Sequence, residues 1–150
     1  MEHVSFDELE NRPRNASVTR RATEALSLEH MALNYYELAP GDTFSAGMHA
    51  HMEQEEVFLI LEGTATFQTD SEKVSVGPME GVRFEPGEYQ QGRNEGGERV
   101  RALAMGAPRE QLPIHSPVTC RECGAEYHQV EPLSDGFRLE CPECANAFEV

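Results

Sequence analysis

The chain of 150 residues contains no long hydrophobic run. Its longest apolar stretch lies between Val57 and Leu61, whereas a helix that spans a bilayer needs about 20 apolar residues. The segment 1–8 is acidic and has neither the basic flank nor the apolar core of a secretory signal. These absences exclude a protein with membrane-spanning helices, and they predict a cytoplasmic location.

Basic residues are also scarce. The sequence has 12 Lys and Arg residues against 27 Asp and Glu residues, which gives a net charge of −15, and Lys73 is the only lysine. Such a charge repels phosphate backbones and anionic lipid headgroups, so we expect neither a nucleic acid nor a membrane as a partner. Acidity with almost no lysine favours a salt-rich cytoplasm, where salt screens the self-repulsion of a halophilic protein. The alternative is an acidic protein from a GC-rich genome.

The region between Val18 and Met105 consists of short apolar or alternating runs separated by Gly, Pro, Asp and Asn. This pattern predicts an all-β barrel or sandwich. We predict a tight hairpin turn at Glu62 and Gly63, because glycine supplies the positive φ that such a turn needs. One helical turn is expected between Ser5 and Glu10. The predicted strands are 31–38, 57–61, 64–69, 74–76, 82–84 and 99–105.

Four divisions of the chain follow from these patterns. Residues 1–29 form an N-terminal flank, 30–107 the β-barrel, 108–117 a proline-containing linker and 118–150 a cysteine module. By alternation, the predicted interior of the barrel contains Tyr36, Phe58, Ile60, Phe67, Phe84 and Met105.

All four cysteines lie beyond the predicted linker. Cys120 and Cys123 form one C-x-x-C pair, Cys141 and Cys144 form another, and 17 residues separate the pairs. This spacing is typical of a structural zinc site with four thiolate ligands. Disulfides and redox-active pairs are the alternatives, which the expected cytoplasmic location and the absence of a βαβ pattern disfavour. The segment resembles a zinc ribbon. Seven acidic residues against two arginines make a protein partner more suitable for it than a nucleic acid.

The barrel region carries the pattern His-x-His-x₄-Glu at His49, His51 and Glu56. Residues two apart on a strand point to the same side, so both imidazoles can face one point, and Glu56 opens the next strand. Two imidazoles and one carboxylate are the ligand set of a non-haem Fe(II) centre, and they also suit Mn, Ni, Co or Zn. A polar strand on the barrel rim is the alternative interpretation.

Together with Gly63, these residues have the spacing of the first motif of the cupin superfamily, which the region 30–107 resembles. Gly87 and Asn94 match the second motif, which places Gln90 where the family has a histidine as fourth metal ligand. The resemblance implies a jelly-roll barrel with a divalent metal (Fe, Mn, Ni or Zn) held by His49, His51 and Glu56. Gln90 would supply a weaker neutral ligand or hold a metal-bound water.

The resemblance leaves three functions open. The first is a metal-dependent enzyme, such as a dioxygenase or isomerase of a small molecule; no general base is identifiable. The second is a non-catalytic cupin that binds a small ligand or acts as a sensor, whose acidic ribbon docks a protein partner. The third is a structural barrel with an empty site, which the substitution at Gln90 allows. An open sheet edge would further favour a homodimer.

Overall fold

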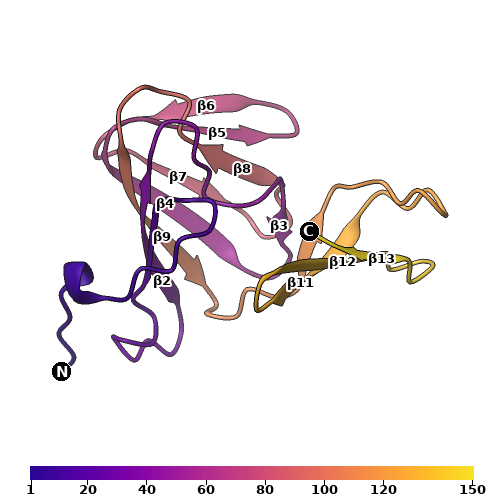
Figure 1. Cartoon of the computed structure of the whole chain (residues 1–150), viewed down its shortest axis with the longest axis horizontal. Helices are drawn as coiled ribbons and strands as arrows, with labels where there is room; N and C mark the ends of the chain where they lie inside the picture. Colours follow the sequence, from indigo (N-terminus) through magenta and orange to yellow (C-terminus); the bar gives the residue numbers. More distant parts are fainter.

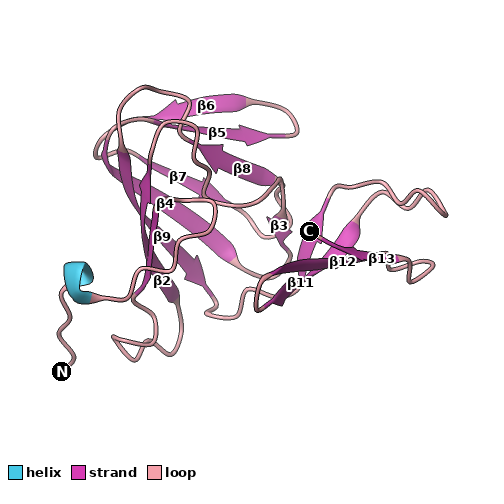
Figure 2. Cartoon of the chain, viewed as in Figure 1, coloured by secondary structure: helices cyan, strands magenta, loops and turns pink.

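The computed structural model describes residues 1–150 and confirms the all-β prediction. Strands account for nearly all of the regular structure (Figure 2), and the one helical element is the 3-10 turn η1 (Phe6–Glu8), which follows Ser5 within the expected segment 5–10. No helix long and apolar enough to cross a membrane is present. Three antiparallel sheets build the molecule.

Two sheets form the barrel and face each other across the core (Figure 1). The larger sheet has five strands, and the smaller has three. In spatial order, the larger sheet consists of β1 (Val18–Arg21), β2 (Ala32–Leu38), β9 (Val100–Ala107), β4 (Glu55–Glu62) and β7 (Gly81–Phe84). The smaller sheet consists of β6 (Lys73–Val76), β5 (Ala65–Thr69) and β8 (Gln90–Arg93).

The third sheet extends from the barrel into the C-terminal module. Residues 114–116, inside the segment for which the sequence predicts a linker, form a strand of this sheet. In spatial order, the third sheet consists of β13 (Ala147–Glu149), β12 (Gly136–Glu140), β11 (His128–Leu133), β10 (Ile114–Ser116) and β3 (Ala50–His51).

Aromatic side chains from both barrel sheets fill the core. Phe67 is fully buried, and its ring centroid lies 4.9 Å from that of Phe58 and 5.5 Å from that of Phe44. Phe84 and Ile60 are buried beside them, and Tyr36 packs against the cluster. Five of the six predicted interior residues therefore contribute to the core, because strand alternation places every second side chain inside.

Met105 is the exception, and its predicted interior position is wrong. Met105 lies in register with Leu33 on β2 and Val57 on β4, and it lines a shallow groove together with Val57. Its neighbour Ala104 is buried in the core. Neighbouring residues on a strand point to opposite faces. The small side chain of Ala104 therefore points into the core, and the larger side chain of Met105 points outward.

The turn at Glu62 and Gly63 also differs from the prediction. Gly63 has the expected positive φ of 73°, but β4 and β5 belong to different sheets, so the turn carries the chain across the barrel instead of closing a hairpin. A Cβ atom on Gly63 would overlap the carbonyl oxygen of Arg99. Glycine is therefore required here for close backbone contact as well as for its backbone conformation.

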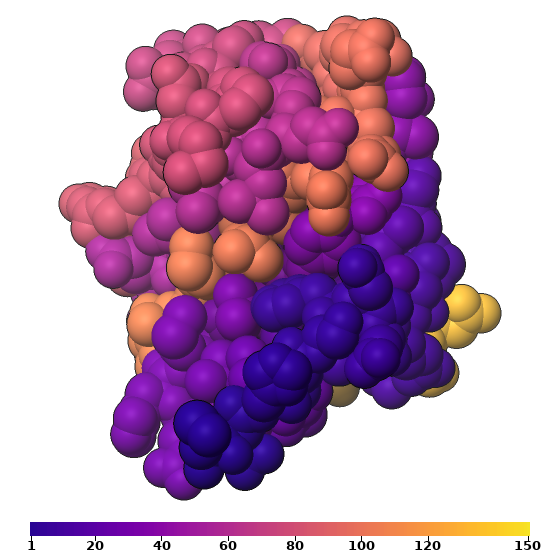
Figure 3. All heavy atoms as spheres, turned by 90° about the vertical axis from the view of Figure 1, so that its left-hand side faces the viewer, coloured from indigo at the N-terminus to yellow at the C-terminus, as the bar shows by residue number.

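The N-terminal segment lies on the barrel surface, as the indigo residues in Figure 3 show. β1, within the predicted flank 1–29, pairs with β2 along its length. The ring of Phe6 packs edge-on against Tyr35 at 6.1 Å, and Arg20 donates a hydrogen bond to the carbonyl oxygen of Asp7. The segment therefore continues the large sheet and covers part of it.

The carboxylate of Asp42 fastens this segment to the barrel, and its removal is expected to destabilise the fold. One oxygen accepts hydrogen bonds from the backbone N–H of Ser17 at 2.8 Å, from the Ser17 hydroxyl and from the N–H of Ala39 at 3.0 Å. We expect Asp42→Ala to lower the free energy of unfolding by about 1–3 kcal/mol. Chemical denaturation measures the change, with the exposed Asp70→Ala as control; equal effects of the two substitutions would contradict the assignment.

The same contact makes a defined contribution to pH-dependent stability. Burial alone would raise the pKa of Asp42, but the hydrogen bonds from Ser17 and Ala39 outweigh it and lower the pKa below its ordinary value. A carboxyl group with a lowered pKa stabilises the fold above its ordinary pKa, and this stabilisation is lost as the pH falls through the lowered value. The Asp42→Ala variant should lack this part of the acid dependence.

Candidate functional site

Backbone pairing brings the predicted barrel ligands together. His49 and Gln90 form an isolated antiparallel bridge in which each N–H donates to the other's carbonyl oxygen, at 3.1 and 2.9 Å. His51 lies on β3, and Glu56 lies near the start of β4, opposite Gly106 on β9. Three separate pairings therefore position the four side chains.

The functional atoms converge at one point inside the barrel. His49, His51 and Glu56 each place one ligand atom within 4.8 Å of the other two. His51 Nε2 lies 3.7 Å from Glu56 Oε2, and Gln90 Nε2 donates a hydrogen bond of 2.9 Å to the same oxygen. The structure thus assembles His49, His51, Glu56 and Gln90 in one cluster, and it can hold a metal ion.

Backbone carbonyl groups orient both imidazole rings. His49 Nδ1 lies 3.1 Å from the carbonyl oxygen of Gly47, and His51 Nδ1 lies 3.0 Å from that of Gln111. A carbonyl oxygen only accepts hydrogen bonds, so each Nδ1 carries a proton, and Nε2 is the nitrogen left to bind a metal. Metal-binding histidines in proteins are held in this way.

The electrostatics of the cluster disfavour charge in the absence of a cation. Burial, together with the nearby His51, lowers the pKa of His49 to about 4, although the hydrogen bond to Gly47 opposes the shift. His49 is therefore neutral at pH 7 and can act as a ligand. Burial raises the pKa of Glu56, while His51 and Gln90 oppose this shift. A divalent cation between these groups would compensate for the burial of the carboxylate.

The buried amide of Gln90 tests whether the residues of this site suit a metal ion. Gln90 is 2 % exposed, and its Oε1 atom has no hydrogen-bond partner. A buried acceptor without a partner costs about 1–3 kcal/mol. Rotation of the amide exchanges Oε1 with Nε2, which lies 3.4 Å from His49 Nε2 and 2.9 Å from Glu56 Oε2. Two imidazoles, one carboxylate and one amide oxygen suit a first-row divalent ion, so the residues fit a metal.

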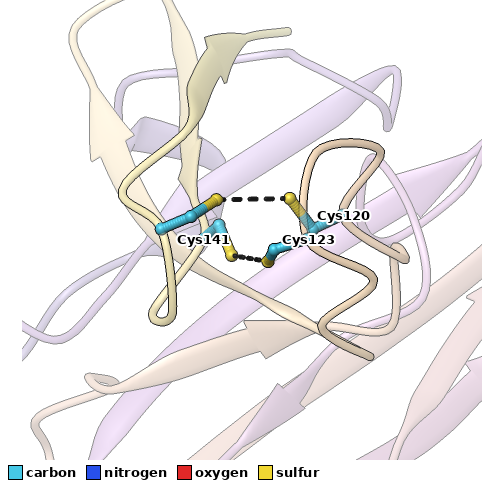
Figure 4. Close-up of side chains that lie close together, drawn as sticks. Cys120, Cys123 and Cys141 are labelled. Atoms are coloured by element: carbon cyan, nitrogen blue, oxygen red, sulfur yellow. Dashed lines mark hydrogen bonds between the residues drawn. The ribbon is translucent and has the colours of Figure 1, made fainter.

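The four cysteines of the C-terminal module form a second cluster. Their sulfur atoms all lie within 4.8 Å of one another, with 3.7 Å between Cys120 and Cys144 and 3.5 Å between Cys123 and Cys141. Figure 4 shows the sulfurs facing one another between two loops. A disulfide requires about 2.05 Å, whereas tetrahedral zinc with Zn–S bonds of about 2.3 Å places its sulfurs about 3.8 Å apart. The cluster therefore matches zinc and could bind it.

Two loops of the same form present these sulfurs. The N–H of Gly124 donates to Cys120 O at 2.9 Å, and the N–H of Ala145 donates to Cys141 O at 3.0 Å. Both donors have positive φ, 79° and 57°. The backbone N–H groups of Cys123 and Glu122 lower the pKa of Cys120 to about 6, which favours the thiolate, the form that binds metal. His115 and His128 lie outside this cluster.

The sequence predictions missed two residues near the barrel site. One is Gln111, whose carbonyl oxygen holds His51. The other is Gln54, which is 2 % exposed, packs against Gly106 and donates a hydrogen bond of 2.7 Å to Pro108 O. A backbone carbonyl belongs to every residue, so no sequence signal could have indicated Gln111. A glutamine between acidic residues indicates burial only weakly.

Comparison with protein families agrees with this architecture. Residues 34–106 match the family model of the cupin domain. This region therefore resembles a cupin domain, and its fold is that of a cupin. No curated protein matches the sequence of the chain.

Solved structures share the fold at low sequence identity. A sugar phosphate isomerase of the cupin superfamily from Silicibacter pomeroyi is 18% identical, with a TM-score of 0.64 over 99% of this chain and 91% of that chain. The polyketide cyclase RemF from Streptomyces resistomycificus is 20% identical, with a TM-score of 0.66 over 81% and 89%. A predicted oxalate decarboxylase from Thermotoga maritima is 20% identical, with a TM-score of 0.61 over 71% and 98%. The match to the first protein includes the C-terminal module as well as the barrel.

Proposed function

We propose that the cupin domain binds a divalent metal ion through His49, His51 and Glu56, with Gln90 at the fourth position, and that it acts on or binds a small molecule there. One observation carries the proposal. The Nε2 atoms of both histidines lie beside the Glu56 carboxylate, while backbone carbonyls hold both Nδ1 atoms in the ligating tautomer.

A bound metal would supply a Lewis acid or a centre for O₂. His49, His51 and Glu56 would hold it on one face, which leaves positions for a bidentate small molecule with oxygen donors. Without a metal, Gln90 Nε2 donates to Glu56 Oε2 and keeps the carboxylate in position; rotation of the amide would turn Oε1 toward the metal instead. The names of the similar structures, a sugar phosphate isomerase, an oxalate decarboxylase and a polyketide cyclase, support small-molecule chemistry. More specifically, we propose that this activity is that of an isomerase or a dioxygenase.

The alternative is a non-catalytic cupin that binds a small ligand or acts as a sensor. The seven acidic residues of the module support the docking of a protein partner there. Removal of residues 116–150 distinguishes the two functions, because an adaptor should lose its partner in a pull-down, whereas an enzyme supplied with saturating metal should retain turnover. The homodimer remains a prediction, which light scattering tests.

We also propose that the module binds structural zinc, and that the protein works in the cytoplasm. The sulfur separations of 3.5 and 3.7 Å support thiolates that share an ion. Because oxidation would convert the thiolates to disulfides, such a site requires a reducing compartment.

Elemental analysis of metal per chain tests the barrel site. We expect two metal ions per chain in the wild type, one of them zinc, and only the zinc in His49→Ala/His51→Ala. The double variant His3→Ala/His30→Ala, which changes two exposed histidines, is the matched control and should keep both ions. A single zinc in all three proteins would contradict metal binding in the barrel. Iron, manganese or nickel in the wild type would favour the enzyme.

A further inference from the structure

The sheet that contains the strands of the C-terminal module also contains one of the proposed barrel ligands, His51. β3 is the edge strand of this sheet and carries His51, which lies in register with Ile114 on β10. β10 in turn pairs with β11 of the C-terminal module, where Ile114 lies opposite Val130. In Figure 1, β3 stands between the barrel and the module. The two candidate metal sites are therefore joined by one hydrogen-bonded sheet.

Residues 108–116, which we call the strap, hold the histidine-bearing loop at several points. The carbonyl oxygen of Gln111 holds His51 Nδ1, and that of Pro113 accepts the N–H of Met52 at 2.9 Å. The Ser116 hydroxyl donates to the carbonyl oxygen of Met48 at 3.3 Å. The strap thus contacts the loop before, at and after His51, and its position determines the orientation of that ring.

The strap depends in turn on the module. β10 has only three residues, and its side opposite β3 pairs with β11. Cys120 and Cys123 lie in the loop that joins β10 to β11, while Cys141 and Cys144 lie between β12 and β13. A metal held by all four cysteines ties these loops together. Arg14 adds a second attachment, since it donates to the carbonyl oxygens of Leu133 and Ser134 at 3.1 and 3.2 Å.

The two histidines differ in what orients them. His49 Nδ1 is held by Gly47, two residues away in the same loop, whereas His51 Nδ1 is held by Gln111, which is 60 residues away. Loss of the strap should therefore free the ring of His51 and leave that of His49 in place. This asymmetry provides an internal control within one molecule.

We propose that zinc binding by the four cysteines sets the metal affinity of the barrel, because it holds the strap whose Gln111 carbonyl positions His51. The inference rests on the proposed function, and it assigns the C-terminal module a role in that site. Gln111 is a positioning residue that acts through its backbone. Removal of hydrogen bonds that orient metal-binding histidines typically weakens metal affinity 10- to 100-fold.

The test uses the full chain with ¹⁵N-labelled histidine. Cys123→Ser/Cys144→Ser removes two exposed cysteines and with them the zinc. We expect the His51 ring nitrogens to lose the signature of a fixed Nδ1–H tautomer, while those of His49 retain it. Mn²⁺, which prefers oxygen ligands to thiolates, should bind the barrel of this variant 10- to 100-fold more weakly than that of the wild type. Electron paramagnetic resonance measures this affinity.

A second variant keeps the cysteines and weakens the strap. Ile114→Gly removes the buried side chain opposite His51, and Val74→Gly on the exposed strand β6 is the matched control. Only Ile114→Gly should change the His51 signal and lower Mn²⁺ affinity with zinc still bound. If both strap-disrupting variants kept wild-type Mn²⁺ affinity and an unchanged His51 signal, this inference would be overturned, while the proposed function would stand. Failure of the zinc-loaded wild type to bind Mn²⁺, Fe²⁺ or Ni²⁺ would overturn the proposed function, and the inference with it.

Discussion

Replacement of Cys141 by serine is expected to unfold the C-terminal module. Only four residues between 118 and 150 are buried, and two of them, Cys120 and Cys141, are predicted zinc ligands; the others are His128 and Leu139. So small a core cannot offset the entropy of ordering the segment. Structural zinc supplies about 10–16 kcal/mol of binding free energy in comparable modules, and most of the stabilisation depends on the complete ligand set.

Hydrogen exchange measured by mass spectrometry follows this change strand by strand. In Cys141→Ser, β11, β12 and β13 should lose their protection, whereas β4 and β9 in the barrel should keep theirs. Glu143→Gln, an exposed position in the same loop, is the control and should behave as the wild type. Full protection of the three module strands in Cys141→Ser would show that zinc does not stabilise the module.

Phe67→Ala should have the largest effect of any single core substitution in the barrel. Phe67 is fully buried on β5 and contacts the rings of Phe44, Phe58 and Phe84. Gly92 on the neighbouring strand lies directly against it, since a Cβ atom there would overlap the Phe67 ring. The removal of such a side chain costs about 3–5 kcal/mol, because the rigid surroundings leave a cavity.

Urea denaturation of the metal-free protein measures this loss. Val74→Ala on the adjacent strand β6, where the side chain is 43 % exposed, is the control and should change the free energy of unfolding by about 0.5 kcal/mol or less. Similar losses in both variants would show that the ring cluster does not hold the two barrel sheets together.

Local spacing was sufficient to predict most of the barrel strands and the members of both clusters. Strand positions follow from alternation and from glycine and proline breaks, so β2, β4, β5, β6, β7 and β9 lie at or near the predicted ranges. The i, i+2 spacing of His49 and His51 places both rings toward one point, and two C-x-x-C pairs form two similar loops. These features depend on neighbours in the chain. The predicted ranges leave out β1, β3, β8 and β10, which are short, polar or defined by distant partners, and they do not extend to the module strands β11, β12 and β13.

Local spacing along the chain does not predict interactions between distant segments. Nothing local distinguishes Gln111, because its contribution to His51 is a carbonyl oxygen 60 residues away. The outward position of Met105 depends on the register of β9 against β2 and β4, and the crossing at Gly63 depends on the pairing of β4 and β5 with different sheets. The acidic composition, in turn, carries no information about three-dimensional contacts, so salt adaptation stays a prediction.

The amino-acid sequence alone therefore specified an all-β cupin fold, the residues of two candidate metal sites and most of the side chains that fill the barrel, because each of these depends on residue type and short-range spacing. Only the tertiary structure decided that the two sites share a sheet and that the predicted linker holds His51. The physical reason is that pairing between β3 and β10 consists of backbone hydrogen bonds, which every residue can make, and their partners are chosen by the packing of the whole chain.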